Sequence, residues 1–259
     1  MQYATPSIDP DAVAGRFGLA EDLPALQGDW HQHARPQLLY ASQGALRLYA
    51  ERLQVVLPPE RAAWIPAGLP HRVSCGRPAH LRTVYLLPED GGDEGLAVFS
   101  APPLLREMVL QAAAWGPSPP DDPGVLPFLE ALAHLARRWR AAPLALGLPA
   151  AQSPALAAAL GLLEDRLARP VGLADAARAA GLSPRTLQRR CQDELGMPLG
   201  AWLHRARVAR SLELLAIPHL SVGEIAVLVG YGSSAAYCRA FHDLLGSAPG
   251  AWRPGRSAD

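Results

Sequence analysis

Apolar and polar residues follow three different patterns along the chain. Up to about residue 100, short apolar runs such as LLYA, ALRLYA, LQVVL, AAWIP and RTVYLL are separated by Pro and Gly, which is typical of a compact β fold. From Pro103 to Arg140, LLREMVLQAAAW and LPFLEALAHLARRW have helical spacing, and GPSPPDDPG separates them. After Pro154 every apolar pattern is helical. The patterns predict an α+β chain.

These changes of pattern also predict where the domains begin and end. Residues 1–100 form a β domain, 101–142 a helical region, 143–153 a hinge rich in Pro and Ala, and 154–259 an all-α domain. The length of 259 residues suits two domains of ordinary size.

The segment GLADAARAAGLSPRTLQRRCQDELG predicts two short helices joined by a tight turn. Gly181 follows the first helix and supplies its left-handed cap. Ser183 and Pro184 then begin the second helix as its N-cap and its first residue. Two short helices joined through a glycine turn are what a helix-turn-helix unit requires.

The second of these helices divides its side chains between two faces. Leu187, Cys191 and Leu195 recur every four residues and are expected to face the core. The opposite face carries Arg185, Gln188 and Arg189. Arg can donate two hydrogen bonds to guanine and Gln can pair with adenine in the major groove, so we expect this helix to read bases.

The same arrangement returns in LSVGEIAVLVGYGSSAAYCRAFHDLLG. Ser221 and Glu224 form a capping box, Gly230 ends the first helix, and Ser233 or Ser234 caps the next. The buried stripe of that next helix is predicted to be Tyr237, Phe241, Leu244 and Leu245. Its outward face is predicted to carry Ala235, Arg239 and His242.

A continuous helix is predicted between the two units, over LGAWLHRARVARSLELLA. At 1.5 Å per residue it is about 27 Å long. A stiff spacer of that length can place two recognition helices in successive segments of the major groove, about 34 Å apart.

The two units together resemble the DNA-binding domain of AraC/XylS-type regulators. The resemblance covers GLSPRTLQRRCQDELGMPLGAWLHRARVARSLELL and EIAVLVGYGSSAAYCRAFHDLLGSAPGAWR. It includes the GY before the second recognition helix, the aromatic Phe241, and the closing pattern of Gly246, Pro249, Trp252 and Arg253. Cys191 departs from the usual phenylalanine. The second helix has few donors besides Arg239, which favours contacts to phosphate there.

The resemblance implies that the partner is double-stranded DNA, with RNA polymerase as a further candidate partner of an activator or repressor. The DNA-binding residues that it implies, together with the helix caps, are Ser183, Arg185, Thr186, Gln188, Arg189, Ser233, Ser234, Ala235, Arg239 and His242. The formal net charge of the chain is zero. The case therefore depends on the placement of individual arginines, because a single exposed Arg is more often simply solvated.

Three histidines stand out in the β domain. His31 and His33 are two residues apart in HQHARPQLLYASQG, so on a strand they would point to one face. Gln37 follows them, and PAGLPH ends in His71. This spacing resembles the two motifs of cupins, which are small double-stranded β-barrels. Gln37 stands where cupins usually have Glu.

Convergent imidazoles could hold Zn²⁺, Ni²⁺, Fe²⁺ or Cu²⁺, with Gln37 as a weak fourth ligand or as a hydrogen-bonding neighbour. The alternative is that the histidines make internal hydrogen bonds or line a ligand pocket. Candidate pocket residues are the histidines with Tyr40, Trp64 and Tyr85. Without the carboxylate, an iron oxygenase site is less favoured.

Two functional hypotheses follow. In the first, a small molecule or a metal in the barrel changes how a DNA-binding regulator presents its C-terminal half. The phrase QLLYASQGALRLYA resembles a subgroup of AraC-type regulators with cupin sensors, some of which govern efflux genes. In the second, the chain is a metal-dependent cupin enzyme with a helical appendage.

The remaining features concern location and assembly. No apolar run reaches the length of a membrane span and no secretory signal begins the chain, so we expect a cytoplasmic protein. Three widely spaced cysteines predict no disulfide framework. An apolar stripe of Leu104, Leu105, Met108 and Val109 either pairs two copies into a homodimer or packs against the barrel.

Overall fold

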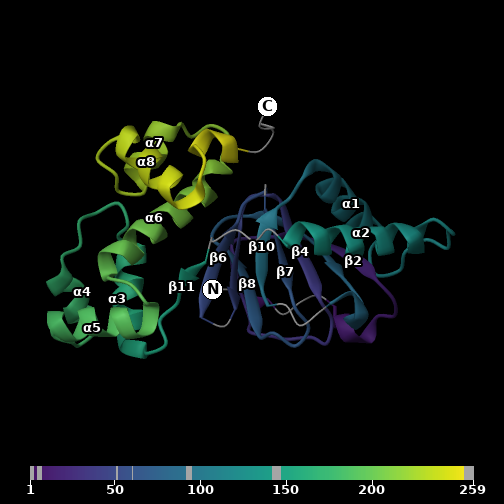
Figure 1. Ribbon diagram of the computed structural model, residues 1–259, viewed down its shortest axis with the longest axis horizontal. Helices are drawn as coiled ribbons and strands as arrows, with labels where there is room; N and C mark the ends of the chain where they lie inside the picture. The colour runs from purple at the N-terminus through teal and green to yellow at the C-terminus, as the bar shows by residue number, and fades with distance from the viewer. Residues whose placement is uncertain are drawn as a thin grey trace. The chain divides into compact units, whose positions relative to one another are not determined.

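The computed structural model describes residues 3–4, 8–50, 52–59, 61–91, 95–141 and 147–253. The chain forms two compact units, one of residues 1–51 and 56–145 and one of residues 52–55 and 146–259. Figure 1 shows the first unit as facing β-sheets with two helices along one of them, and the second unit as a set of short helices around the longer α6.

The first sheet has five strands in the order β10-β7-β4-β9-β2, with antiparallel neighbours. Its strands are β2 (Phe17–Leu23), β4 (Gln37–Gln43), β7 (Arg61–Ile65), β9 (Ala79–Tyr85) and β10 (Ala97–Ser100). The second sheet has the order β1-β3-β8-β5-β6-β11. Its strands are β1 (Tyr3–Ala4), β3 (Leu26–Gly28), β5 (Leu46–Ala50), β6 (Leu53–Leu57), β8 (His71–Cys75) and β11 (Leu148–Pro149). The arrangement confirms the predicted cupin-like β fold.

Two helices cover the outer face of the five-stranded sheet, α1 (Pro103–Trp115) and α2 (Val125–Arg140). Leu105, Met108 and Val109 of α1 are buried in one cluster with residues of β4, β7 and β9. Leu104, the remaining member of the predicted stripe, is 55% exposed. Three of the four residues of the stripe therefore pack against the sheet, which is one of the two uses predicted for it.

The second unit contains six α-helices among the residues described. They are α3 (Pro154–Asp165), α4 (Leu173–Ala179), α5 (Pro184–Leu195), α6 (Leu199–Leu215), α7 (Val222–Leu228) and α8 (Ser234–Leu245). Short 3₁₀ turns lie at Pro10–Ala12, Pro88–Asp90 and Pro249–Trp252. The all-α expectation for residues 154–259 is confirmed for the part that the structure describes. Within the described residues, no helix is both long and apolar enough to cross a membrane.

The predicted hinge lies partly outside the described residues, because 142–146 are not among them. Its described part is held by hydrogen bonds. The carbonyl of Pro149 accepts from Trp202 Nε1 at 2.8 Å. The Glu194 carboxylate accepts from the Gln152 N–H at 2.9 Å and from the Ser153 N–H at 2.8 Å. Residues 149–153 therefore lie against α5 and α6.

A close backbone approach joins α1 to β2. A Cβ atom at Gly18 would lie 2.1 Å from the carbonyl oxygen of Ala112, well inside contact distance. We expect Gly18→Ala to lower the free energy of unfolding by about 1–3 kcal/mol, because the helix must move away from the sheet. Urea unfolding followed by tryptophan fluorescence measures the effect.

The matched control is Gly95→Ala, whose added Cβ meets no atom within 4 Å. Its unfolding midpoint should stay at the wild-type value. Equal midpoints for Gly18→Ala and the wild type would show that α1 does not depend on this contact.

Candidate DNA interface and histidine cluster

The two predicted helix-turn-helix turns are closed by the same backbone hydrogen bond. The Leu182 N–H donates to the Ala177 carbonyl at 2.9 Å, and the Tyr231 N–H donates to the Ala226 carbonyl at 2.8 Å. The glycine before each donor has a left-handed φ, 63° in the first turn and 85° in the second. This closure satisfies carbonyl groups that the end of a helix leaves free.

Side-chain caps then start the helices on the far side of each turn. Ser183 Oγ accepts from the Thr186 N–H at 3.2 Å and hydrogen-bonds Thr186 Oγ1 at 2.8 Å. In the second unit Ser233, and not Ser234, is the cap, because its Oγ accepts from the Ala236 N–H at 3.2 Å. The predicted capping box at the start of α7 is also present, with both of its hydrogen bonds.

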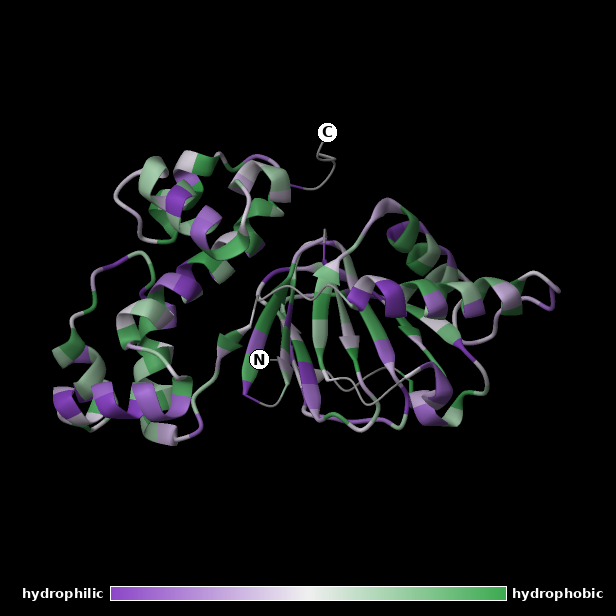
Figure 2. Ribbon diagram, viewed as in Figure 1, coloured by the Kyte–Doolittle hydropathy of each residue, from purple (hydrophilic) through white to green (hydrophobic). Residues whose placement is uncertain are grey.

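The faces of α5 are arranged as the sequence predicts. Leu187, Cys191 and Leu195 are buried, whereas Arg185, Gln188 and Arg189 are exposed. Neither of these arginines forms an ion pair with a residue that the structure describes, whereas the neighbouring Arg190 lies 3.4 Å from the Glu194 carboxylate. Hydrophilic residues, drawn in purple, cover much of α5 in Figure 2. The exposed face of α5 can therefore offer two unpaired guanidinium groups and an amide to DNA.

The faces of α8 differ from the prediction at one end. Tyr237 and Phe241 are buried, but Leu244 and Leu245 are only half-buried in the last turn of the helix. The outward positions are exposed, as predicted: Ser234, Ala235, Arg239 and His242. Arg239 is the only arginine of α8, so this helix has fewer donors than α5.

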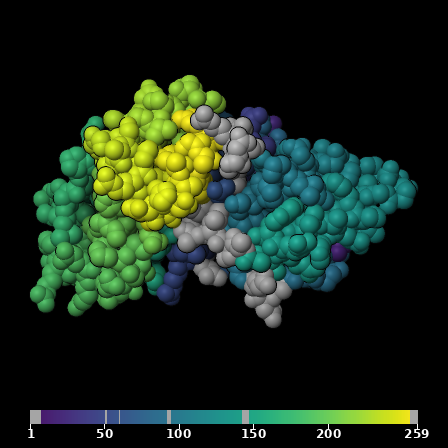
Figure 3. Space-filling view, turned by 45° about the horizontal axis from the view of Figure 1, so that its top comes forward, coloured from purple at the N-terminus to yellow at the C-terminus, as the bar shows by residue number. Residues whose placement is uncertain are grey.

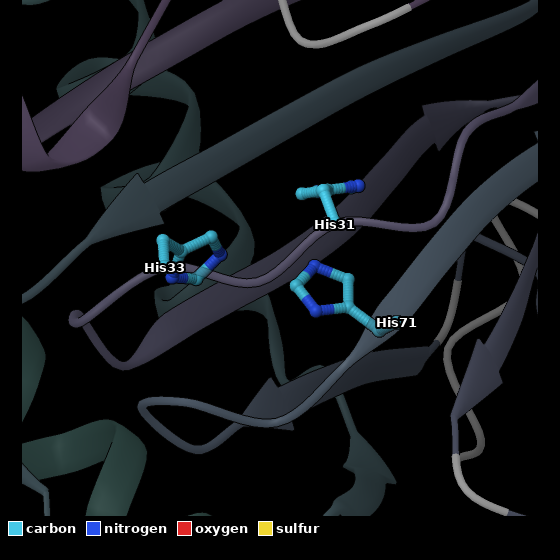
Figure 4. Close-up of side chains that lie close together, drawn as sticks. All are labelled: His31, His33 and His71. Carbon is cyan, nitrogen blue, oxygen red and sulfur yellow. The ribbon is translucent and has the colours of Figure 1, made fainter.

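The three histidines of the β domain lie together, but not in the way the sequence suggested. His31 and His33 are outside the named strands, so the expectation that a strand aligns them is wrong. Instead, His31 and His71 form an isolated β-bridge, with N–H···O bonds of 2.9 Å in both directions. One ring nitrogen from each histidine lies within 4.8 Å of the others. Figure 4 shows the three rings around a common space.

Each histidine is anchored through the same ring atom. Nδ1 of His31 lies 3.0 Å from the Asp29 carbonyl, Nδ1 of His33 lies 2.7 Å from the Arg35 carbonyl, and Nδ1 of His71 lies 2.8 Å from the Leu69 carbonyl. A carbonyl only accepts, so each Nδ1 must carry the hydrogen. In a neutral ring Nε2 is then left with its lone pair.

Gln37 lies beside the cluster in a fixed orientation. Thr83 Oγ1 donates to the Leu38 carbonyl at 2.9 Å, so it accepts from Gln37 Nε2, also at 2.9 Å. This turns Gln37 Oε1 toward His33 Nε2, at 3.2 Å. Two lone pairs therefore face each other when His33 is neutral. No motif in the sequence pointed to Thr83.

Burial keeps two of the rings neutral. It lowers the pKa of His71 to about 4, against the opposing effect of its hydrogen bond to Leu69. Burial also lowers the pKa of His33. His71 Nε2 is buried and has no hydrogen-bond partner among the described residues. His33 and His71 therefore favour the neutral imidazole with an available lone pair, which is the form in which histidine binds metals.

The predicted pocket residues separate into two places. Tyr85 lies in the cluster, with its ring centroid 5.2 Å from that of His33 and its hydroxyl 3.4 Å from Gln37 Nε2. Tyr40 and Trp64 belong to the core under α1 and α2. Side chains alternate along a strand, so Tyr40 lies on the face of β4 opposite to Gln37. The structure does not bring these two residues to the histidines.

Comparison with known proteins gives two family matches. Residues 176–255 match the model of a helix-turn-helix domain. Residues 14–182, more than half of the chain, match the model of an AraC-like ligand binding domain.

The curated relatives that match are HTH-type transcriptional regulators. The chain is 25% identical over 222 residues to the HTH-type transcriptional regulator NimR of Escherichia coli, which covers 85% of this chain and 80% of that protein. It is 35% identical over 100 residues to the HTH-type transcriptional regulator GlxA of Rhizobium meliloti, covering 39% of this chain and 31% of that protein. A solved AraC-type regulator from Chromobacterium violaceum is 25% identical, with a TM-score of 0.38, and covers 39% of this chain and 89% of that chain.

These relatives are transcriptional regulators, which decides against the hypothesis of a cupin enzyme. The ligand-binding match covers the histidine cluster and most of the barrel, and the helix-turn-helix match covers both capped recognition helices. The chain therefore belongs to the AraC family of helix-turn-helix transcriptional regulators that carry an N-terminal AraC-like ligand-binding domain.

Proposed function

We propose that the protein is a sequence-specific transcription regulator in which α5 and α8 read DNA and an effector in the β domain controls that reading. The observation that carries the proposal is the pair of capped recognition helices, each with a buried apolar face and an exposed polar one. The effector acts through its different affinity for two arrangements of the protein, not by touching DNA.

Within this proposal the two recognition helices have different tasks. Arg185, Gln188 and Arg189 of α5 read base edges, because they combine exposure with the donor geometry that guanine and adenine require. Arg239 and His242 of α8 mainly contact phosphates, because the rest of the exposed face has short side chains. Specificity then depends chiefly on α5.

We propose a divalent transition metal as a ligand of the sensor, held by His31, His33 and His71. Three Nε2 lone pairs, with Nδ1 hydrogens donated to main-chain carbonyls, form the arrangement that fixes histidine ligands at metal centres. Imidazole favours Zn²⁺, Ni²⁺, Fe²⁺ or Cu²⁺. Bound at such a site, the metal would supply a positive charge that ties the three rings together.

Two further observations support a cation here. The buried Nε2 of His71 lacks a described partner. Gln37 Oε1 faces the lone pair of His33, and a nearby cation turns that repulsion into attraction. Nitrogens that share one metal ion at about 2.0–2.1 Å lie within about 4.2 Å of one another. One ring nitrogen from each of the three histidines lies within 4.8 Å of the others, which is close to this arrangement. A small organic effector on the same histidines and Tyr85 is the alternative ligand.

Location and further partners are also part of the proposal. A regulator of bacterial genes works on chromosomal DNA, which places it in the cytoplasm. RNA polymerase and a second copy of the chain are its proposed protein partners. The direction of control, activation or repression, depends on where its operator lies relative to the promoter.

Base reading by α5 can be tested by DNA selection and gel shifts. The full-length protein should select a specific site from a random duplex library. Arg189→Ala should weaken binding to that site by about 1–3 kcal/mol, because a bidentate contact to a base is lost. Binding to unrelated DNA should fall less, and gel shifts at fixed salt measure both affinities.

Arg190→Ala is the matched control, because it removes the same charge from a side chain held by Glu194. It should change specific and unrelated binding by similar factors. An equal loss on all sequences for Arg189→Ala would assign Arg189 to phosphate contacts.

Metal binding by the three histidines can be tested directly. After exposure to Zn²⁺ or Ni²⁺ and dialysis, the wild-type protein should retain about one ion per chain, measured by elemental analysis. His71→Gln should bind at least about tenfold more weakly, since one of three ligands is lost. Metal should also raise the melting temperature of the wild type, because it binds only the folded form.

His80→Gln is the control for this experiment, because His80 is outside the cluster and lies near Asp22. It should retain metal as the wild type does. Failure of the wild type to hold metal, or equal binding by His71→Gln, would contradict the metal proposal and favour an organic effector. The DNA-binding proposal would be unaffected.

A further inference from the structure

Reading DNA with two recognition helices requires that they stay at a fixed separation. Helix α6 connects the α4–α5 helix-turn-helix to the α7–α8 helix-turn-helix, and its residues divide between them. Trp202 and Ala206 are buried with the core of the α4–α5 helix-turn-helix. Further along the helix, Val208, Leu212 and Leu215 are also buried. Arg207 lies where these two stretches meet.

Arg207 contacts the main chain of the α4–α5 helix-turn-helix. Its Nε donates to the carbonyl of Leu167 at 3.2 Å. Leu167 follows α3 and is buried in the core of the α4–α5 helix-turn-helix. Figure 1 shows the connection between α3 and α4 extending toward the part of the unit that holds α7 and α8. One nitrogen of the guanidinium is thus fixed to the first helix-turn-helix unit.

The same guanidinium contacts the α7–α8 helix-turn-helix. Its Cζ lies 5.7 Å from the ring centroid of Tyr231, the buried residue that closes the second turn. An arginine over an aromatic ring is held by electrostatic attraction to the ring face. Arginine suits both contacts at once, because its planar group can donate at its edge and stack on its face.

The backbones of the two helix-turn-helices also meet at this point. A Cβ at Gly230 would lie 2.2 Å from the Leu167 carbonyl oxygen and 2.9 Å from Arg207 Nη2. At Gly181, the corresponding glycine of the first turn, an added Cβ meets no atom within 4 Å. The second turn therefore needs glycine for its left-handed φ and also for this close approach. In the space-filling view the yellow C-terminal helices lie against the green segment before them (Figure 3).

We infer that Arg207, the Leu167 carbonyl and Gly230 form a junction that sets the separation of α5 and α8, which makes Arg207 a positioning residue for recognition of two adjacent DNA boxes. The inference rests on the proposed use of both recognition helices. When one helix is bound, the junction holds the other near its box at a high effective concentration. Loss of the junction lowers that concentration and leaves each helix intact.

The test uses the full-length protein and the duplex that it selects from a random library. Three probe types are derived from that duplex: both boxes intact, one box scrambled, and the spacing between boxes changed in single base-pair steps. Arg207→Ala should bind the two-box probe about tenfold more weakly, whereas its affinity for single-box probes stays within about twofold of the wild type. Its preference for one spacing should also become weaker.

Arg205→Ala is the matched control, because it removes the same charge from an exposed side chain of α6. It should keep the wild-type spacing preference. Arg207→Lys keeps the charge but not the planar group, so it should behave like Arg207→Ala on the spacing series.

Unchanged two-box affinity and spacing preference in Arg207→Ala would overturn the junction alone. An equal loss on two-box and single-box probes would also overturn it, because Arg207 would then act in folding or on phosphate. A wild-type protein that selects a single box would overturn both the junction and the proposed use of two helices.

Discussion

The DNA-binding half depends on one constraint, the reversal of the chain after a short helix without loss of its final backbone hydrogen bonds. A left-handed glycine permits the N–H that follows it to reach back to the preceding helix, and the same bond closes both turns. A serine cap then starts the recognition helix. The exposed arginines of α5 and the polar face of α8 are displayed only because these two turns are made.

Features set by near neighbours in the chain could be predicted from the sequence. The caps at Ser183 and Ser221, the buried face of α5 and the helical span of α6 depend on residues within a few positions, so spacing alone reveals them. The grouping of the three histidines was also predicted, but for the wrong reason. A bridge between His31 and His71, and main-chain carbonyls that hold each Nδ1, bring the rings together instead of a shared strand.

Features set by long-range packing could not be predicted in the same way. The alternation of β4 is visible in the sequence, but not which face α1 and α2 cover, so Tyr40 and Trp64 were assigned to the pocket although they belong to the core. Thr83 orients Gln37 from 46 residues away, and nothing local marks it. The half-buried leucines at the end of α8 show that helical period gives a face but not the depth of burial.

The contact between residues 152–153 and α5 has a mechanical consequence. Glu194, which accepts hydrogen bonds from both backbone N–H groups, lies in the last turn of α5, whereas Arg185 and Arg189 lie in its first half. The twelve residues of α5 span about 18 Å. A displacement of residues 152–153 would therefore act first on the C-terminal end of α5, and the helix would transmit it to the end that carries Arg185 and Arg189.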